Sequence, residues 1–483
     1  MENTGPAESH ANRVLCVDLD GTLVRTDTLV ESLLLFLRLQ PFRIPLLVIW
    51  LARGRSYLKM KLAERVLPSI ETLPYHTELL AYLRKQKSAG VKLVLAAGAD
   101  GRIASRVAGH LSLFDEVWSS DGRQNLVGER KAQLLGGKYA AFEYIGNSRR
   151  DLPVWLRSES AIVVSPSPGL LRLLRRHSIP AKTIGGREAA PRFFAWLRLL
   201  RIHQWVKNLL IFFPVLTAHR LTDWPTVWLA AVGFLAFSLA ASGSYLVNDL
   251  FDLQADRAHP GKCRRPLACG TLNALPGLAA ALALYLAAWA TVSLLPAGAR
   301  MVLAAYVILT LTYSLWLKRF LVVDVLLLVC FYLLRIFLGG LATGISISVW
   351  LLAFSMFFFL SLALVKRLTE LRALERTAGA NWEVSARGYQ VSDVGLAGSL
   401  AGSSAYLSVV LLALYINSPE VRLLYSHPQF LWPLCLLIIY WLSRMILIAN
   451  RGQLSDDPIV FATRDRASWI TGAAVLVVLY AAR

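Results

Sequence analysis

The chain has 483 residues, of which 56% are hydrophobic and only 17% are charged. This composition is too apolar for an ordinary soluble enzyme and indicates a membrane protein, while the length allows more than one domain. The net charge of +20 does not indicate a nucleic-acid partner, because many basic residues flank apolar runs, where they orient helices and meet anionic lipid or phosphate. The five cysteines form no CxxC pair, so we expect neither a disulfide framework nor a zinc site.

The distribution of apolar residues along the chain indicates two domains. As far as about Gly186, charged and apolar residues are mixed as in a globular protein, whereas apolar runs dominate from about Trp205 onward. We therefore expect a soluble α/β domain over residues 1–186, a linker or interfacial segment over 187–204, and an all-α membrane domain over 205–483. The N-terminus carries no apolar signal region, so the first domain is expected in the cytosol.

Three short apolar runs in the first domain are typical of buried parallel strands. The run Val14–Val17 ends at Asp18-Leu19-Asp20-Gly21-Thr22, and the run Val91–Ala97 follows further along the chain. The third run, Phe142–Ile145, is followed by Gly146-Asn147-Ser148-Arg149-Arg150-Asp151. Since ligands of open α/β sheets bind beyond the carboxyl ends of the strands, these polar segments are expected to form one site.

The DxDGT segment, with GNSxxD after a later strand, resembles the haloacid dehalogenase superfamily of phosphatases over roughly residues 13–185. The resemblance implies a Rossmann-like fold in which Asp18 attacks phosphorus and Asp20 donates a proton to the leaving oxygen. It also implies a magnesium site formed by these two aspartates with Asn147 and Asp151, and a phosphate-neutralising lysine, Lys131. A carboxylate nucleophile divides a difficult displacement into two easier ones, and the metal screens the phosphoryl oxygens.

Two positions depart from the pattern of that superfamily. Ala96-Ala97-Gly98-Ala99 stands where the superfamily places a Ser or Thr that binds the phosphoryl group, and Asn147 stands where an aspartate is usual. Two hypotheses therefore remain for the first domain, which is either an active phosphatase or a structural or regulatory module without catalysis.

An insertion from about Leu29 to Gln86 separates the first two predicted strands and has a helical pattern. It contains an apolar stretch, Phe42–Ala52, that has arginines on both sides and is too short to span a bilayer. One interpretation is a helical cap packed over the phosphatase-like site. The alternative is an interfacial helix whose basic flanks meet lipid headgroups while its apolar face dips below them.

Nine apolar runs near spanning length are found in the second domain and predict a polytopic membrane domain of about nine transmembrane helices. They cover residues 205–219, 226–246, 275–295, 300–317, 321–343, 349–366, 395–416, 429–449 and 467–482. Basic residues concentrate on alternate connections. The positive-inside rule therefore places these connections, and the N-terminal domain, on the cytosolic side of the inner (plasma) membrane.

The first long basic connection also carries a cluster of acidic residues. Asp249, Asp252 and Asp256 stand at positions i, i+3 and i+7, so on one helix they would share a face. Carboxylates this close repel one another unless cations lie between them. Magnesium suits such a site because it prefers oxygen ligands and is commonly shared between a few carboxylates and substrate phosphates. The alternative is a solvated helix end.

The acidic segment, residues 248–267, resembles the aspartate-rich loop of the UbiA superfamily of intramembrane transferases, and the resemblance extends from about Phe193 to Arg483. Four segments look like its decaprenyl-phosphate phosphoribosyltransferase branch, namely residues 201–208, residues 313–318 with Asp324, residues 332–335 and residues 456–466. Members of that branch transfer phosphoribose from 5-phosphoribosyl diphosphate (PRPP) to a polyprenyl phosphate and release diphosphate.

The resemblance implies roles for individual residues. Asp249, Asp252 and Asp256, helped by Asn248, would hold magnesium against the diphosphate of PRPP and ease its departure from C1 of ribose. The other substrate-binding candidates are Gln204, Lys207, Asn208, Lys262, Arg265, Tyr313, Lys318, Asp324, Arg335 and Lys366.

Among these candidates, Lys262 and Arg265 would neutralise the leaving diphosphate. Lys207, Lys318 and Lys366 would bind the 5-phosphate or the acceptor phosphate, although each is also an ordinary residue of the positive-inside pattern. The acceptor phosphate is largely ionised at pH 7, so it attacks without a general base.

Several hypotheses follow for the whole chain. The first is a bifunctional enzyme, in which the membrane domain makes polyprenyl-phosphoryl-5-phosphoribose and the first domain removes the 5-phosphate. The second keeps the transferase and makes the first domain non-catalytic.

The third hypothesis is prenyl transfer from a prenyl diphosphate. It is less favoured because the segment Lys318–Asp324 offers one acidic residue where aromatic prenyltransferases carry a second acidic motif. In each, the polyprenyl chain would lie in a groove lined by runs such as Leu351–Leu364. A transporter would leave the acidic cluster unexplained.

Overall fold

The structure is a computed structural model that describes residues 13–185, 192–259, 261–378, 388–454 and 457–483. The chain divides into two compact units. The first comprises Met1–Leu199 with Asn248–Ala279, and the second comprises Leu200–Val247 with Ala280–Arg483. The acidic segment thus belongs to the same unit as the N-terminal domain. Residues 187–191 of the predicted linker lie outside the described residues.

The first unit is built on a six-stranded parallel sheet with the order β3-β2-β1-β4-β5-β6. Its strands are β1 (Val14–Val17), β2 (Lys92–Asp100), β3 (Glu116–Ser120), β4 (Glu143–Gly146), β5 (Ser160–Val164) and β6 (Ala181–Ile184). The three strands predicted from the sequence are confirmed as β1, β2 and β4. This is the doubly wound order, whose topological switch point lies between β1 and β4.

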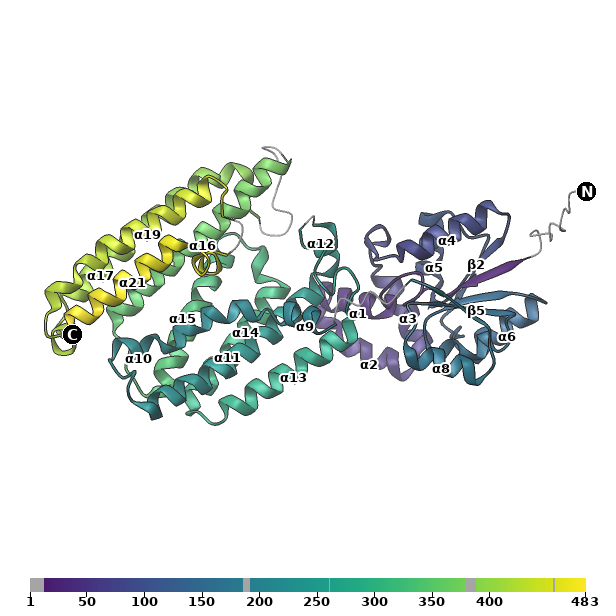
Figure 1. Cartoon of the computed structure of the whole chain (residues 1–483), viewed down its shortest axis with the longest axis horizontal. Coiled ribbons are helices and arrows are strands. Elements are labelled where there is room, and N and C mark those ends of the chain that lie inside the picture. Colours follow the sequence, from purple (N-terminus) through teal and green to yellow (C-terminus); the bar gives the residue numbers. More distant parts are fainter. Residues whose placement is uncertain (1–12, 186–191, 260, 379–387, 455–456) are drawn as a thin grey trace, which may run out of the picture. The chain divides into compact units, whose positions relative to one another are not determined.

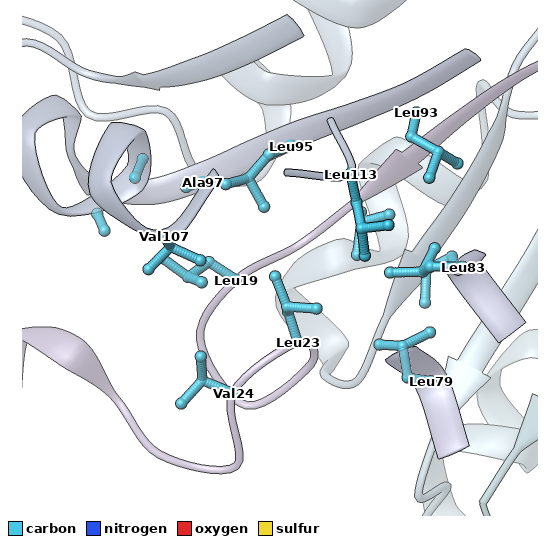
Figure 2. Packing of buried hydrophobic residues seen from close by; sticks show 14 of the residues in the cluster. Leu19, Leu23, Val24, Leu79, Leu83, Leu93, Leu95, Ala97, Val107 and Leu113 are labelled. Atoms are coloured by element: carbon cyan, nitrogen blue, oxygen red, sulfur yellow. The ribbon is translucent and has the colours of Figure 1, made fainter. Parts of the chain in front are cut away.

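Helices cover both faces of the sheet (Figure 1). They are α4 (Thr77–Ser88), α5 (Gly101–Leu111), α6 (Glu129–Lys138), α7 (Leu152–Trp155) and α8 (Pro168–Arg176). Side chains alternate across the strands, so Leu15 and Val17 of β1 pack in a cluster with α4 and α5, while Cys16 packs with α6 and α8. Figure 2 shows the first of these clusters, in which Leu79 and Leu83 of α4 lie beside Leu93 of β2.

The insertion after β1 is helical, as predicted. It forms α1 (Thr28–Leu39), α2 (Ile44–Ala52) and α3 (Arg55–Arg65), with a bend of 113° between α1 and the segment Pro41–Ala52. Phe36 of α1 packs against Trp50 of α2 at a ring-centroid distance of 5.5 Å. The opposite side of the α2 segment is open, since Phe42 is 87% exposed and Val48 is 69% exposed.

The second unit is helical. The described residues contain seven helices that are long and apolar enough to cross a membrane, including α11 and α13, which run between the two units. The number rises to eight if the bent pair α1–α2 is counted as one span. The long helices are α11 (Trp224–Phe251), α13 (Ala274–Val292), α14 (Ala297–Leu315), α15 (Val323–Thr343), α16 (Val349–Ala378), α17 (Val394–Ile416) and α19 (Pro433–Asn450). The shorter ones are α10 (Phe213–Thr217), α18 (Pro419–Leu424), α20 (Pro458–Ala462) and α21 (Arg466–Ala482). Helix α9 (Arg192–Leu200) belongs to the first unit except for its last residue. The chain is a multi-pass membrane protein.

The seven or eight candidate spans among the described residues agree approximately with the predicted number of about nine. The run 205–219 forms a 3-10 helix, Ile202–Phe212, followed by the five-residue α10, and the last run forms the 17-residue α21. The first of these segments does not form one long apolar helix. Its polar side chains form hydrogen bonds inside the protein. Asn208 donates a hydrogen bond to the Ser238 hydroxyl at 2.9 Å, and the Trp205 indole donates to Ser242 at 3.0 Å.

This 3-10 helix packs tightly against α15. A Cβ atom added at Gly339 would lie only 2.1 Å from the carbonyl oxygen of Ile211, so the close approach requires glycine at this position. The contact holds the polar residues of the segment beside the centre of α15, where Arg335 lies.

Candidate functional site

The carboxyl ends of β1 and β4 bring together most of the residues predicted for the phosphatase-like site. Lys131 of α6 donates a hydrogen bond to Asp18 Oδ1 at 2.6 Å and another to the Tyr144 hydroxyl at 3.0 Å. That hydroxyl donates to Asp151 Oδ1 at 3.1 Å. Lys131 and Asp151 are 3% and 5% exposed, so the site is a buried network with both charges of the Asp18–Lys131 pair satisfied.

Asn147 and Asp20 lie in the two loops that frame this network. Gly21 has φ +76°, and a Cβ atom there would meet the Asn147 side-chain nitrogen at 2.3 Å, so the two loops touch at a position that requires glycine. Asp20 Oδ1 accepts a hydrogen bond from the backbone N–H of Thr28 at 2.8 Å, at the start of α1. The structure therefore places all the predicted residues of this site at one edge of the sheet.

Burial sets the protonation behaviour of the two aspartates. Burial raises the pKa of Asp18 to about 6, although Lys131 acts in the opposite direction. Burial and the neighbouring Asp27 raise the pKa of Asp20 to about 7, against the hydrogen bond from Thr28. A carboxyl group with a raised pKa is suited to carry a proton, which is the role that the sequence pattern implies for Asp20.

A residue of the insertion, Lys59 of α3, was not predicted as part of this site. Its ammonium group donates to the Gly98 carbonyl at 2.6 Å and to Asn125 Oδ1 at 2.9 Å, and burial lowers its pKa. Gly98 lies in the segment where the superfamily usually has a Ser or Thr, so Lys59 brings a cation to that position. No motif marks this lysine. Its contacts favour the cap interpretation of the insertion.

The acidic loop departs from the single-helix prediction. α11 ends at Phe251 and α12 (Leu253–Ala258) begins after Asp252, so Asp249 and Asp256 lie on different helices. Asp252 occupies the break with φ −95° and ψ 9°. The prediction that the three aspartates share one helical face is thus wrong, because spacing alone does not reveal that the helix is interrupted at its middle carboxylate.

Asp249 and Asp256 nevertheless converge on one cation. The guanidinium of Arg265 donates to Asp249 Oδ1 at 3.0 Å and to Asp256 Oδ2 at 2.6 Å. The two aspartates are 3% and 4% exposed, while the arginine side chain is 27% exposed. Burial raises the pKa of Asp256, although Arg265 opposes the shift. Two buried carboxylates aimed at one positive group are a donor set that fits a magnesium ion shared with substrate phosphates.

Asp252 points elsewhere. Its Oδ1 lies 3.5 Å from the guanidinium of Arg38, on α1. In the described parts of the chain no group of three or more His, Cys, Asp or Glu side chains is close enough to hold a metal ion without substrate. Lys262, also predicted here, is half-buried in the same loop.

In the second unit, two of the predicted lysines share a carboxylate. Asp457 Oδ2 lies 2.7 Å from the ammonium of Lys207 and 3.5 Å from that of Lys366. Although burial alone would raise it, these lysines hold the pKa of Asp457 well below its usual range. Asp457 was not predicted as a site residue. It stands in an acidic pair before Pro458, the one sequence feature that could have pointed to it.

Arg335 and Asn208 form a second buried polar group. Arg335 Nε donates to Asn208 Oδ1 at 2.8 Å, and the guanidinium lies 4.7 Å from the ring centroid of Phe237. Both predicted residues are thus brought together. Gln204 is half-buried on the same 3-10 helix as Asn208.

The remaining predicted residues lie around the end of α14 and the start of α15. Asp324 is 0% exposed, pairs with Arg367 Nε at 2.6 Å and accepts a hydrogen bond from the Tyr389 hydroxyl at 2.9 Å. These contacts favour a structural role for Asp324. Tyr313 packs edge-on against Phe331 at 5.7 Å, and Lys318 is buried.

Two apolar cavities are found in the second unit. One, of about 380 Å³, has among its lining residues Leu210, Phe213, Ile336, Leu351, Phe354 and Phe358. The other, of about 390 Å³, has among its lining residues Lys207, Leu209, Phe212, Phe358, Leu362 and Trp441. Both include residues of the run 351–364 that the sequence analysis singled out for a polyprenyl groove. The second combines apolar walls with one basic lining residue, Lys207.

Comparisons with known proteins give a family and named relatives. The model of the UbiA prenyltransferase family matches residues 209–469. An uncharacterized protein, y4nM, of Sinorhizobium fredii is 37% identical over 95% of this chain and 89% of its own length. A decaprenyl-phosphate phosphoribosyltransferase of Mycolicibacterium smegmatis is 30% identical over 58% of this chain and 92% of its own length.

Solved structures resemble the two parts of the chain separately. A UbiA homolog from Archaeoglobus fulgidus bound to GPP and Mg²⁺ has a TM-score of 0.45 and 19% identity, over 59% of this chain and 99% of the homolog. A HAD family hydrolase from Salmonella enterica has a TM-score of 0.27 and 16% identity, over 35% of this chain and 67% of the hydrolase.

Proposed function

Because the chain belongs to the UbiA prenyltransferase family, we propose that it is a membrane phosphoribosyltransferase. It moves 5-phosphoribose from PRPP to a polyprenyl phosphate and releases diphosphate. The observation that carries this proposal is the convergence of Asp249 and Asp256 on Arg265, which marks a place for a cation among buried carboxylates. The relative of Mycolicibacterium smegmatis supports the choice of donor, since its name specifies phosphoribosyl transfer to decaprenyl phosphate.

Asp249 and Asp256, with Asn248 beside them in sequence, would hold a magnesium ion at the position that Arg265 now neutralises. When bound, the ion supplies positive charge to the diphosphate of PRPP and so stabilises it as a leaving group. Arg265 has two tasks in this proposal. It balances the carboxylates in the free protein, and with Lys262 it is available to bind the oxygens of the leaving diphosphate because its side chain is only partly buried.

The transfer itself is a displacement at C1 of ribose. An oxygen of the acceptor phosphate forms the new bond to C1 while the bond from C1 to the diphosphate oxygen breaks. No general base is needed, because the acceptor phosphate is already ionised at pH 7. Lys207 and Lys366 are both paired with Asp457, so their ammonium groups are ordered for binding a phosphate.

The apolar cavity beside Lys207 supports a lipid acceptor. A polyprenyl chain would lie against residues such as Phe358, Leu362 and Trp441, with its phosphate at the ammonium of Lys207. Apolar walls with one cation fit a phosphate on a long hydrocarbon better than a soluble acceptor. The basic connections and the N-terminal domain lie on the cytosolic side of the plasma membrane in this proposal, where PRPP is available.

A second activity is proposed for the N-terminal HAD-like domain, the removal of the 5-phosphate from the lipid-linked product. The buried network of Asp18, Lys131, Tyr144 and Asp151 supports it, since it provides a carboxylate nucleophile beside a cation that would meet the phosphoryl oxygens. Asp18 would attack phosphorus while the bond from phosphorus to the ribose oxygen breaks and Asp20 protonates that oxygen. Water would then hydrolyse the phosphate from Asp18, which releases free phosphate and restores the carboxylate. A magnesium ion at Asp18, Asp20, Asn147 and Asp151 would screen the phosphoryl charge.

Purified full-length protein in lipid nanodiscs, supplied with labelled PRPP, polyprenyl phosphate and magnesium, tests both steps. We expect a labelled lipid product, diphosphate in equal amount, and free phosphate appearing afterwards. Labelled prenyl diphosphate offered in competition should not be incorporated, and its incorporation in place of phosphoribose would overturn the choice of donor. Phosphate release that persists in Asp18→Asn would remove the second activity from the N-terminal domain.

A further inference from the structure

Helix α1 of the N-terminal domain is bound to the acidic loop by a buried ion pair. Arg257 of α12 donates two hydrogen bonds to the Glu31 carboxylate, Nη1 to Oε2 at 2.8 Å and Nη2 to Oε1 at 2.6 Å. The side chains are only 4% and 2% exposed. The hydroxyl of Thr26 also donates to Glu31, and Arg257 Nε donates to the carbonyl of Ala268 at 2.9 Å. Both charges are therefore satisfied in one fixed geometry.

A second contact lies two turns further along α1. Arg38 Nη1 donates to the backbone carbonyl of Phe251 at 2.9 Å, and its Nη2 lies 3.5 Å from Asp252 Oδ1. Phe251 is the last residue of α11, where helix carbonyls lack intrahelical partners and a cation is favoured. Glu31 and Arg38 are seven positions apart and therefore lie on the same face of α1.

The end of the acidic loop is also fitted against the N-terminal domain. Gly270 has φ +74°, and a Cβ atom there would lie 2.8 Å from Cβ of Arg25 and 3.4 Å from Cγ of Pro74. The loop is thus held at three places, namely the break at Asp252, the last turn of α12 at Arg257, and Gly270.

The other end of α1 belongs to the phosphatase-like site. The N–H of Thr28, the first residue of α1, donates to Asp20 Oδ1, and Asp27 caps the helix by accepting from the N–H groups of Leu29 and Val30. One helix of 12 residues therefore begins at the proton donor of one proposed site and fastens the loop of the other.

We propose that α1 is a positioning element for the acidic loop, and that Glu31 acts through Arg257 to keep Asp256 available for a magnesium diphosphate. The inference rests on the proposed transferase function. Arg257 is adjacent to Asp256 in sequence. Engaged by Glu31 and by the Ala268 carbonyl, its guanidinium does not neutralise the neighbouring carboxylate. Released from Glu31, it becomes a competing cation in the place where the metal should bind.

The test uses full-length protein in nanodiscs and compares wild type with Glu31→Gln. We expect the magnesium concentration for half-maximal phosphoribosyl transfer to rise about ten- to hundredfold, as for loss of residues that orient metal ligands, while kcat at saturating magnesium changes much less. Hydrogen exchange of the α12 amides, measured without metal or substrate, should be faster in the variant.

Three further variants keep the result interpretable. Glu64→Gln makes the same substitution at a partly exposed ion pair with Lys61 elsewhere in the insertion and should behave as wild type in both measurements. The double variant Glu31→Gln/Arg257→Gln should be no worse than either single variant, because the pair acts as a unit. Arg38→Gln should also speed hydrogen exchange of the α12 amides. If Glu31→Gln does not fold, Arg38→Gln replaces it in the test, because the Arg38 side chain is less buried than that of Glu31.

The outcomes separate this inference from the proposed function. Wild-type magnesium dependence and wild-type exchange in Glu31→Gln and Arg38→Gln would overturn the positioning role. A wild-type protein that transfers nothing from PRPP would overturn the proposed function instead, and the exchange of α12 would still decide whether α1 holds the loop.

Discussion

The two acidic regions of the molecule hold their carboxylates in different ways. In the N-terminal site, Asp18 and Asp151 are joined through Lys131 and Tyr144, which lie on regular elements around the sheet and are buried. All four residues belong to the first unit and are held by hydrogen bonds to one another. That site is therefore complete within the α/β fold, and its electrostatics are set before any ligand arrives.

The acidic loop depends on partners of another kind. Asp249 and Asp256 meet Arg265, a partly exposed residue outside any helix, and Asp252 meets Arg38 from α1. An arginine on a loop can move when a metal and a diphosphate take its place. The comparison teaches that the carboxylates of the first region are paired with buried residues, whereas those of the acidic loop are paired with a partly exposed arginine and with helix α1 of the same unit.

The largest effect is expected for Asp18, the proposed nucleophile of the N-terminal site. Asp18→Asn removes the attacking carboxylate and should lower phosphate release from the phosphoribosyl lipid by about 10⁴-fold or more, as when covalent nucleophiles are removed from other hydrolases. Phosphoribosyl transfer should be unchanged, and the 5-phosphorylated lipid should accumulate on a chromatogram. Asp115→Asn, at an exposed pair with Lys87, is the control. A loss of transfer in Asp18→Asn would break the separation of the two regions.

A somewhat smaller effect is expected in the acidic loop. Asp249→Asn should lower phosphoribosyl transfer by about 100- to 1000-fold, because one charged ligand to the metal diphosphate is lost. Assays that follow diphosphate release should show this loss over a range of magnesium concentrations. Asp223→Asn, at the other end of α11, changes an exposed carboxylate and should be nearly silent. A defect in Asp223→Asn as large as that in Asp249→Asn would contradict a specific role for the loop.

The smallest catalytic effect is expected for the lipid phosphate site. Lys207→Met should raise KM for polyprenyl phosphate about tenfold, the equivalent of roughly 1.4 kcal/mol, and leave KM for PRPP nearly unchanged. Initial rates at varied concentrations of each substrate measure this split. Lys92→Met, at the partly exposed pair with Glu116, provides a lysine control. An equal rise in both KM values would assign Lys207 to the donor instead.

Much of the fold could be predicted because its patterns are local. Apolar runs bounded by polar segments predicted β1, β2 and β4 to within a few residues. The number of membrane spans was predicted only approximately, because hydropathy does not show whether a polar side chain finds a partner inside the protein. Lys207 and Asn208 are buried among protein partners, and their segment folds into a 3-10 helix.

The candidate sites could be predicted only where a motif marks them. Asp18 and Asp249 stand in recognisable segments, whereas Lys59 and Glu31 stand in an insertion of ordinary helical sequence. Their roles depend on contacts between positions far apart in the chain, such as Glu31 with Arg257. The spacing of the acidic residues would place them on one face of a single helix, whereas the structure has a break between two helices at Asp252.

The open side of the α2 segment has a practical consequence for anyone who isolates the N-terminal domain. Leu39, Phe42, Val48 and Leu51 are each more than half exposed on a short segment. In a fragment that ends near residue 186, this apolar surface is exposed to water. We expect the fragment to self-associate in a concentration-dependent way that mild detergent reverses. Sedimentation with and without detergent would show it, and Phe42→Ser together with Val48→Ser should render the fragment monodisperse.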